Sequence, residues 1–383
     1  MKTAVMYGAG NIGRGFLGEL FSRSGYEVVF IDVNREVVDA LNREGQYPVM
    51  YVTNEGQRCI TVSSVRAVDG NDRDAVVREI AACDIMATAV GVNVLKYIAA
   101  PIARGIELRR SNPDALPLDI LICENLIDAN HALRKMIGDE MDNSGYLDTH
   151  IGFVEASIGR MVPVMTPDMQ MGNLLRVCVE PYAVLPVDRN GFRGEIPDIQ
   201  GLEACDNFDF YIRRKLYVHN MGHAMAAYLG ALRGDEYIWQ AMECDAIRRL
   251  VGDAMSESAK ALSAAYNVPT AEVQAFAEDL IVRFGNRALG DTVARVGRDL
   301  DRKLSAQDRI AGAIGLCREQ GLPYCAIAAG VAAALRFSDG QPGAVAAMLE
   351  NGRFDEVLRD ICGLADDVIS EVLYMHALLA ISK

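Results

Sequence analysis

The 383-residue sequence predicts an α/β protein, with a doubly wound parallel sheet in the first half and a mainly α-helical second half. Short apolar runs alternate with helical patterns up to about residue 123, which is typical of βαβ units in a parallel sheet. From about residue 208 onward, long helical patterns dominate. A chain of this length is expected to hold two cores, so we expect two domains, residues 1–195 and 196–383.

The first domain is expected to begin with a buried strand, followed by a glycine-rich turn and a helix on which Ile12, Phe16 and Leu20 recur every four residues. Residues 44–72 are expected to form a turn-rich insertion, and residues 176–202 a connector rich in turn formers. The expected strands are 3–7, 27–31, 84–90 and 118–123, and the further helices are 35–43, 73–82 and 93–105. In the second domain we expect helices at 209–230, 235–265, 270–284, 305–319, 323–336, 342–349 and 353–380.

Composition and charge restrict the possible partners. The net charge of −14 argues against nucleic acid, which is bound through an excess of Lys and Arg, but a small anionic ligand needs only a local basic cluster. The nine cysteines form no CxxC pair and the chain has five histidines, so we expect reduced thiols and no metal site. No apolar run approaches 20 residues, and a strand begins at Thr3, so neither a membrane span nor a signal peptide is expected. These features favour a cytoplasmic protein that acts on a small molecule.

A glycine motif, Gly8-Ala-Gly-Asn-Ile-Gly13, lies between the first expected strand and helix. In a Rossmann-type domain, such glycines allow a tight turn, a close approach to a pyrophosphate and close helix packing. Asp32 ends the second strand, where a carboxylate accepts hydrogen bonds from ribose and repels a 2′-phosphate, which favours NAD over NADP. The alternative is that the glycines only shape a turn. The cofactor contacts expected here are Gly8, Gly10, Asn11, Ile12, Gly13 and Asp32.

A second turn, after the third expected strand, lies at the carboxyl edge of the sheet, where a bound dinucleotide lies in such folds. We therefore expect Val90, Gly91 and Asn93 beside the cofactor. Asn93 can also cap the following helix, and the two roles are compatible. Arg14 follows the glycine motif and is expected to contact either the pyrophosphate or solvent.

The stretch Lys215-Leu-Tyr-Val-His-Asn-Met-Gly-His223 combines a lysine, an amide and an imidazole. In an α-helix, Asn220 and His223 lie roughly 140° and 80° around the axis from Lys215, so all three can line one side. A lysine whose pKa is lowered by burial can act as a base, and the other two groups can hold an oxyanion. The alternative is a surface helix with a solvated lysine.

Several motifs occur in the order in which the polyol-specific long-chain dehydrogenases carry them, over nearly the whole chain. They are Tyr7-Gly-Ala-Gly-Asn-Ile-Gly-Arg-Gly-Phe16, Thr88-Ala-Val-Gly-Val-Asn93, Cys123-Glu-Asn125, Lys215…Asn220…His223, Arg283-Phe-Gly-Asn286 and Arg295-Val-Gly-Arg-Asp-Leu-Asp-Arg-Lys-Leu304. The chain therefore resembles that family, whose members join a Rossmann-type domain to a helical one, work without metal and are often monomeric. The resemblance implies a monomer or weak oligomer.

The same resemblance implies a set of catalytic roles. Lys215 resembles the general acid/base, Asn125 and Asn220 resemble the pair that holds the substrate oxygen, and His223 resembles a residue that orients the substrate. The implied reaction is the NAD-dependent interconversion of mannitol 1-phosphate and fructose 6-phosphate.

A basic run in the second domain is the densest cationic cluster of this acidic chain, and such a cluster suits a phosphate monoester. The alternative is a solvated helical face whose charges pair with Asp299 and Asp301. The residues expected to bind phosphate are Arg295, Arg298, Arg302 and Lys303.

Three positions depart from the family pattern. Ile158-Gly-Arg-Met161 stands where the family usually has Val-Asp-Arg-Ile, so Gly159 replaces an aspartate. Val92 and Leu300 replace family prolines. Two alternatives therefore stay open: a sister enzyme acting on a free polyol or hexuronate, and a regulatory protein that binds NAD without turnover. The basic run argues against a neutral polyol, and the retained lysine, asparagines and histidine argue against a protein without turnover.

Overall fold

The structure is a computed structural model that describes residues 1–337 and 340–381. The chain divides into two compact units, unit 1 at Met1–Phe208 and unit 2 at Asp209–Lys383. Two parallel strands, β10 (Leu185–Asp188) and β11 (Leu202–Cys205), pair with each other inside unit 1. Within the described residues, no helix is long and apolar enough to cross a bilayer.

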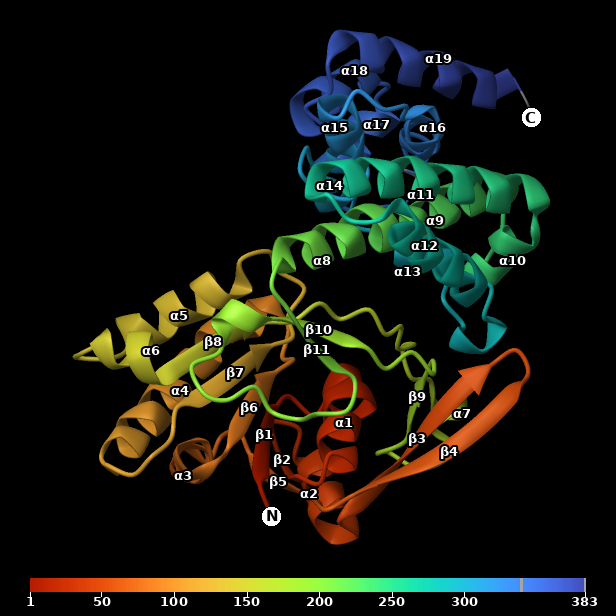
Figure 1. Cartoon of the computed structure of the whole chain (residues 1–383). Helices are drawn as coiled ribbons and strands as arrows, with labels where there is room; N and C mark the ends of the chain where they lie inside the picture. Colours follow the sequence, from red (N-terminus) through yellow and green to blue (C-terminus); the bar gives the residue numbers. More distant parts are fainter. Residues whose placement is uncertain (338–339, 382–383) are drawn as a thin grey trace. The chain divides into compact units, whose positions relative to one another are not determined.

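Unit 1 is built on a six-stranded parallel sheet in the order β5-β2-β1-β6-β7-β8 (Figure 1). The strands are β1 (Thr3–Tyr7), β2 (Glu27–Asp32), β5 (Val65–Asp69), β6 (Ile85–Thr88), β7 (Leu118–Ile122) and β8 (Ile151–Glu155). β1 pairs with β2 on one side and with β6 on the other. The strand order therefore runs from β1 toward β5 on one side of the sheet and from β6 toward β8 on the other. Ligands of doubly wound sheets bind at the carboxyl ends of the strands beside this switch point.

Helices cover both faces of this sheet because successive strand residues point to opposite sides. Ala4 and Met6 face a core formed with α1 and α2, whereas Val5 and Tyr7 face a core formed with α3, α4 and α5. The helices of unit 1 are a π-helical turn at Gly13–Leu17, α1 (Gly18–Arg23), α2 (Arg35–Glu44), α3 (Arg73–Ala82), α4 (Leu95–Arg110), α5 (Ala129–Asp139), α6 (Gly145–His150) and α7 (Pro167–Gln170).

The expectation of a turn-rich insertion at 44–72 is wrong. This segment holds the hairpin strands β3 (Gln46–Thr53) and β4 (Gly56–Ser63), followed by the edge strand β5. β3 also pairs with β9 (Val177–Val179), which gives a separate three-stranded sheet. The hydroxyl of Tyr47 in β3 donates to the carbonyl of Arg14 at 2.7 Å, so this sheet helps to fix the helical segment after the glycine motif.

Unit 2 is mainly α-helical, as expected. Three long patterns are interrupted: the 209–230 pattern is π-helical at Lys215–Asn220, the 235–265 pattern breaks at Cys244, and the 353–380 pattern breaks before α19, where Gly363 has a φ of 63°. The helices are α8 (Phe208–Arg214), α9 (Met221–Arg233), α10 (Ile238–Glu243), α11 (Asp245–Tyr266), α12 (Thr270–Phe284), α13 (Val293–Gly297), α14 (Leu300–Lys303), α15 (Ala311–Glu319), α16 (Cys325–Ala334), α17 (Ala344–Glu350), α18 (Phe354–Glu356) and α19 (Asp366–Ile381).

Candidate active site

The glycine motif of unit 1 forms a tight loop after β1. Gly8 has a φ of 103°, and a Cβ there would lie 2.6 Å from the carbonyl oxygen of Ala89. A Cβ on Gly13 would lie 2.0 Å from the carbonyl oxygen of Gly8, so neither position has room for a side chain. Gly10 is exposed, and among the described residues no atom beyond its chain neighbours lies within 4 Å of where its Cβ would be. The loop is therefore packed at its two ends and open in the middle, which suits the approach of a pyrophosphate.

Asp32 at the end of β2 is tied to the same loop. Its Oδ2 accepts a hydrogen bond from the Ala9 N–H at 2.7 Å, and its Oδ1 accepts one from the Asn34 N–H at 2.9 Å. A carboxylate offers about four acceptor positions, so two of them remain after these bonds are made. The side chain is thus held in place with acceptor capacity for a ribose hydroxyl.

Glu124, to which the sequence analysis gave no role, holds the second cofactor turn. Its two carboxylate oxygens accept hydrogen bonds from the N–H groups of Val90, at 2.9 Å, and Gly91, at 2.8 Å. Burial raises the pKa of this carboxyl group, and the two backbone hydrogen bonds oppose that rise. The sequence feature that could have indicated a role for Glu124 is its position directly before Asn125, which lies exposed after the end of β7.

Asn93 lies exposed in a short 3₁₀ turn at Val92–Val94. The N-cap of α4 is Val94 and receives no side-chain hydrogen bond, so the alternative role of Asn93 as a helix cap is wrong. Glu124 therefore fixes a turn from which Asn93 projects.

Asn11, Ile12 and Arg14 support the glycine loop from within unit 1. The Asn11 side-chain amide donates to the carbonyl of Pro163 at 3.2 Å, and Ile12 packs partly buried against the core. Arg14 is buried, and its Nε donates to the carbonyl of Ala9 at 2.7 Å. The expected alternative that Arg14 contacts solvent is wrong, because the side chain is buried and backbone carbonyls bind its guanidinium.

The segment around Gly159 contains a buried ion pair. Nη1 of Arg160 lies 2.6 Å from Oε2 of Glu19, and both side chains are fully buried. The same nitrogen donates to the carbonyl of Gly15 at 2.8 Å, which helps to satisfy a guanidinium removed from water. A Cβ on Gly159 would lie 3.1 Å from Cε1 of Tyr182. The tyrosine ring thus lies in close contact with the position where the side chain of the family aspartate would begin.

In unit 2, Lys215 and Asn220 begin and end one π-helical turn, and α9 continues from it. Because π-helical hydrogen bonds join residues i and i+5, Asn220 lies about one turn after Lys215. The separation of roughly 140° that an α-helix would impose does not apply here. Lys215, Asn220 and His223 are half-buried, whereas the other positions between Tyr217 and His223 are buried. The three predicted catalytic residues of unit 2 therefore share one partly exposed face.

His223 is held by two residues that the sequence analysis did not assign. Its ring stacks on Phe284, with centroids 4.9 Å apart and an interplanar angle of 8°. Its Nε2 lies 3.3 Å from Oδ2 of Asp291, and the other oxygen of Asp291 accepts a hydrogen bond from Arg295. Phe284 belongs to a motif that carries the family resemblance, and Asp291 precedes Arg295 by four residues. Neither signal by itself indicated a contact with His223.

His219 lies between the half-buried positions and is 5% exposed. Burial and the nearby charge of Arg283 hold its pKa well below the ordinary value of 6.5, so the ring is neutral at pH 7. Its Nδ1 atom is buried without a hydrogen-bond partner among the described residues.

Two of the four predicted phosphate ligands come together. Arg295 and Arg298 line a cavity of about 700 Å³, whose other walls include the carboxylates Asp299 and Asp301. Arg298 is exposed and is in no ion pair within the described part of the chain. The cavity thus places one paired and one unpaired guanidinium together.

The other two cations of the basic run are engaged elsewhere. Arg302 pairs with Asp299 at 2.7 Å and with Asp308 at 3.3 Å. Lys303 is 7% exposed, and its Nζ donates to the carbonyl of Val296 at 2.5 Å. Burial, with the charges of Arg309 and Arg302, lowers the pKa of Lys303 to about 7. The structure therefore favours Arg295 and Arg298 over Arg302 and Lys303 as phosphate contacts.

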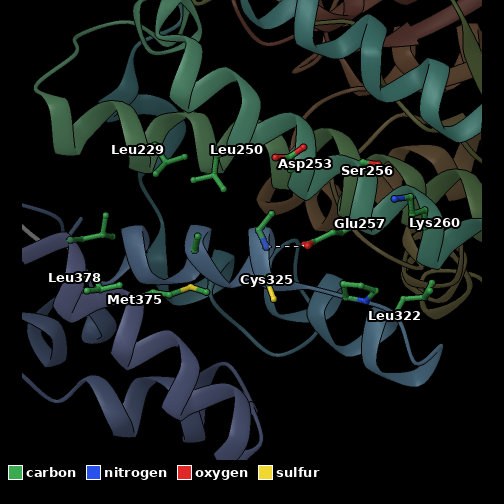
Figure 2. A pocket seen from close by; sticks show the side chains of 14 residues that line it. Leu229, Leu250, Asp253, Ser256, Glu257, Lys260, Leu322, Cys325, Met375 and Leu378 are labelled. Atoms are coloured by element: carbon green, nitrogen blue, oxygen red, sulfur yellow. Dashed lines mark hydrogen bonds between the residues drawn. The ribbon is translucent and has the colours of Figure 1, made fainter. Parts of the chain in front are cut away.

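A separate cavity of unit 2, also of about 700 Å³, has mainly apolar walls from α11, α16 and α19 (Figure 2). Leu250, Met375 and Leu378 lie along it, and Glu257 accepts hydrogen bonds from the Ala326 and Ile327 N–H groups at 3.1 Å. These bonds cap the start of α16. None of the predicted site residues lines this cavity, so it does not contribute to the candidate active site.

Two family models match consecutive parts of the chain. The mannitol dehydrogenase Rossmann domain matches residues 2–201, and the mannitol dehydrogenase C-terminal domain matches residues 207–380. A mannitol-1-phosphate 5-dehydrogenase of Coccidioides immitis is 37% identical over 96% of this chain and 95% of its own. The mannitol-1-phosphate 5-dehydrogenase of Bacillus licheniformis is 37% identical over 95% of this chain and 96% of its own.

Solved structures share the fold at low sequence identity. A substrate-free D-sorbitol dehydrogenase has a TM-score of 0.81 at 14% identity and covers 99% of this chain and 93% of its own. The mannitol 2-dehydrogenase of Pseudomonas fluorescens, in a ternary complex with NAD and D-mannitol, has a TM-score of 0.75 at 16% identity and covers 100% of this chain and 91% of its own.

These matches confirm three predictions from the sequence: the family resemblance, a Rossmann-type sheet followed by a helical domain, and a dehydrogenase. Both family models together span residues 2–201 and 207–380, and the two relatives match along almost their whole length. The chain belongs to the mannitol dehydrogenase family.

Proposed function

We propose that this chain interconverts mannitol 1-phosphate and fructose 6-phosphate with NAD as the hydride carrier. The observation that carries the proposal is the face formed by Lys215, Asn220 and His223, which is connected through Asp291 to Arg295. Proton-transfer groups and a phosphate-binding cation thus belong to one network. Both relatives named above as mannitol-1-phosphate 5-dehydrogenases support this choice of substrate.

The residues of unit 1 fit the NAD that this reaction requires. The open backbone at Gly10 leaves room for the pyrophosphate, and Asp32 is held with acceptor capacity for the ribose. Its negative charge disfavours a 2′-phosphate, so NAD is preferred over NADP. Asn11, Ile12, Val90, Gly91 and Asn93 complete the proposed cofactor contacts, with Glu124 holding the second turn.

When bound, NAD accepts a hydride from the secondary carbinol carbon or returns it in the reverse direction. In the oxidation, Lys215 takes the hydroxyl proton, and in the reduction it gives that proton to the carbonyl oxygen. Asn220 and Asn125 donate hydrogen bonds to this oxygen as negative charge develops on it. Loss of one such donor typically raises the barrier by about 3 kcal/mol. His223 orients the substrate, and no step requires a metal ion.

Lys303 is a rival for the role of base, because a lysine with a pKa of about 7 suits proton transfer at neutral pH. Its Nζ, however, donates to the carbonyl of Val296 and the side chain is 7% exposed. A base needs to reach the substrate hydroxyl within hydrogen-bond distance. Lys215 is half-buried and shares a face with Asn220 and His223, so we assign the proton transfer to Lys215.

The test is NADH oxidation, followed at 340 nm, with fructose 6-phosphate, fructose and fructuronate in parallel. Turnover with fructose 6-phosphate alone is expected, and Lys215→Ala serves as the inactive control. Turnover only with fructose or fructuronate would keep the fold and Lys215 but assign the chain to a sister activity. Tight NADH binding without turnover on any of the three would instead favour a regulatory protein.

A further inference from the structure

Asp291 connects two groups that the proposed function assigns to opposite ends of the substrate. Its Oδ2 lies 3.3 Å from Nε2 of His223, and its Oδ1 accepts a hydrogen bond from the guanidinium of Arg295. The Asp291 side chain is 11% exposed, so water competes little for these contacts. One buried carboxylate therefore holds an imidazole and a guanidinium at a fixed separation.

The backbone at Asp291 is itself well supported. Its carbonyl accepts a hydrogen bond from the Ile238 N–H at 2.9 Å, and the neighbouring Thr292 forms an isolated antiparallel bridge with Tyr237. The Thr292 hydroxyl accepts from the Arg295 N–H at 3.2 Å and caps α13, which carries Arg295. The carboxylate and the arginine are thus held by the same cap.

His223 is restrained by a second contact, since its ring lies parallel to Phe284 with the centroids 4.9 Å apart. Stacking fixes the plane of the ring, and the carboxylate fixes its rotation within that plane. Arg295 has five N–H donors in a planar fork, so the bond to Asp291 leaves donors for a second anion. Arg298 lines the same cavity as Arg295 and adds a second guanidinium.

Resting on the function proposed above, we propose that Asp291 is a positioning residue that sets the distance between the His223 imidazole and the Arg295 guanidinium. The site then recognises the carbinol end and the phosphate end of one substrate at a fixed spacing. A free hexose would fill only the His223 end of this network. Asp291 itself touches neither end of the substrate.

The test compares Asp291→Asn with a matched control, Asp235→Asn. Asp235 has a side chain that is 10% exposed and pairs with Arg233 at 2.8 Å, so the control loses an equally buried ion pair elsewhere in unit 2. For Asp291→Asn, we expect kcat/KM for fructose 6-phosphate to fall about 10- to 100-fold, through both a lower kcat and a higher KM. The KM for NADH should stay within about twofold, and Asp291→Glu should recover part of the loss because it keeps the charge.

A double variant checks the route of the effect. If Asp291 acts through Arg295, the loss in Asp291→Asn with Arg295→Ala should be smaller than the product of the two single losses. Multiplicative losses would overturn the proposal. So would kinetic constants for Asp291→Asn that match the wild type or that match Asp235→Asn.

Imidazole NMR separates this proposal from the proposed function, because it needs no turnover. The chain has five histidines, so the His223 signals can be assigned with a His223→Gln variant. We expect Asp291→Asn to move these signals and Asp235→Asn to leave them in place. If Asp291→Asn leaves the His223 signals in place, the positioning role is overturned even when the enzyme is active. If Asp291→Asn moves these signals but the wild type shows no turnover, only the proposed function is refuted.

Discussion

The buried Lys303 should make the free energy of unfolding rise with pH, because its surroundings lower its pKa in the native state. Lys303 is 7% exposed, its ammonium donates to the carbonyl of Val296, and its pKa falls from 10.5 to about 7. Burial is the main cause, followed by repulsion from Arg309 and Arg302, and the attraction of Asp299 and Asp308 opposes them. In the unfolded chain the lysine regains its ordinary pKa.

Between pH 7 and about 10.5, the unfolded state therefore binds a proton that the native state does not. Stability rises with pH wherever the unfolded state binds more protons, at about 1.4 kcal/mol per pH unit for one proton. Native Lys303 is half-protonated at pH 7, so the rise from this residue between pH 7 and pH 9 is about 2 kcal/mol. Lys303→Met keeps the length of the side chain and removes the charge, and it should remove this rise.

The assay is urea unfolding of the wild type, Lys303→Met and the exposed-site control Lys260→Met at pH 7, 8 and 9, read from the helical signal. We expect Lys303→Met to be more stable than the wild type at pH 7, with a difference that shrinks by about 2 kcal/mol at pH 9. If the difference in unfolding free energy between Lys303→Met and the wild type stayed constant from pH 7 to pH 9, the lowered pKa of Lys303 would be refuted. The KM for fructose 6-phosphate should stay within about threefold, because the ammonium contacts a carbonyl and not the substrate.

Three further outcomes follow from the site. Lys215→Ala should abolish turnover and leave NADH affinity within a few-fold, measured by fluorescence titration, because it removes the base and no cofactor contact. Asp32→Asn should raise the KM for NADH about 10- to 100-fold, because a charge-assisted ribose contact is lost. It should also reduce the preference for NADH over NADPH, because the carboxylate no longer repels the 2′-phosphate. His219→Leu should reduce the loss of unfolding free energy between pH 6.5 and pH 5, because burial holds the pKa of the native imidazole well below 6.5, so the unfolded chain binds a proton there more readily than the native state.

Each of these outcomes has a control. Undiminished activity in Lys215→Ala would overturn the assignment of the base. Asp32 also accepts from Ala9 and Asn34, so the melting temperature must be measured with the kinetics, and an unchanged NADH/NADPH ratio in a folded variant would contradict the ribose contact. Equal pH dependence in the wild type and His219→Leu would show that His219 titrates normally in the native state.

Motifs whose spacing is set by backbone geometry were predictable from the sequence. A Cβ at Gly8 or Gly13 would clash with backbone oxygen atoms. A glycine motif between a strand and a helix predicts this kind of steric restriction. The β3–β4 hairpin was missed because Pro and Gly in the segment read as turn formers, and because β4 is mostly exposed and shows no alternation in burial.

Contacts between distant side chains were not predictable in the same way. Glu124 lies 34 residues from the Val90 N–H that it accepts from, and no periodic pattern links the two. The basic run is continuous in the sequence, yet Lys303 is buried against a carbonyl while Arg298 is exposed. Charge and hydropathy of single residues cannot separate these cases, because burial depends on how α13 and α14 pack.

The π-helical turn explains why a pattern analysis based on α-helical angles understates the Lys215 site. A spacing of five residues separates two side chains by roughly 140° around an α-helix but brings them much closer together around a π-helical turn. The burial pattern does not distinguish α-helical from π-helical winding here. Tyr217, Val218 and His219 are consecutive buried residues, and three adjacent positions point in different directions in either kind of helix. Once wound this way, the turn brings the half-buried Lys215 and Asn220 to one face, and His223 follows in α9. A change that restored α-helical winding there should therefore lower kcat while every one of these side chains remained present.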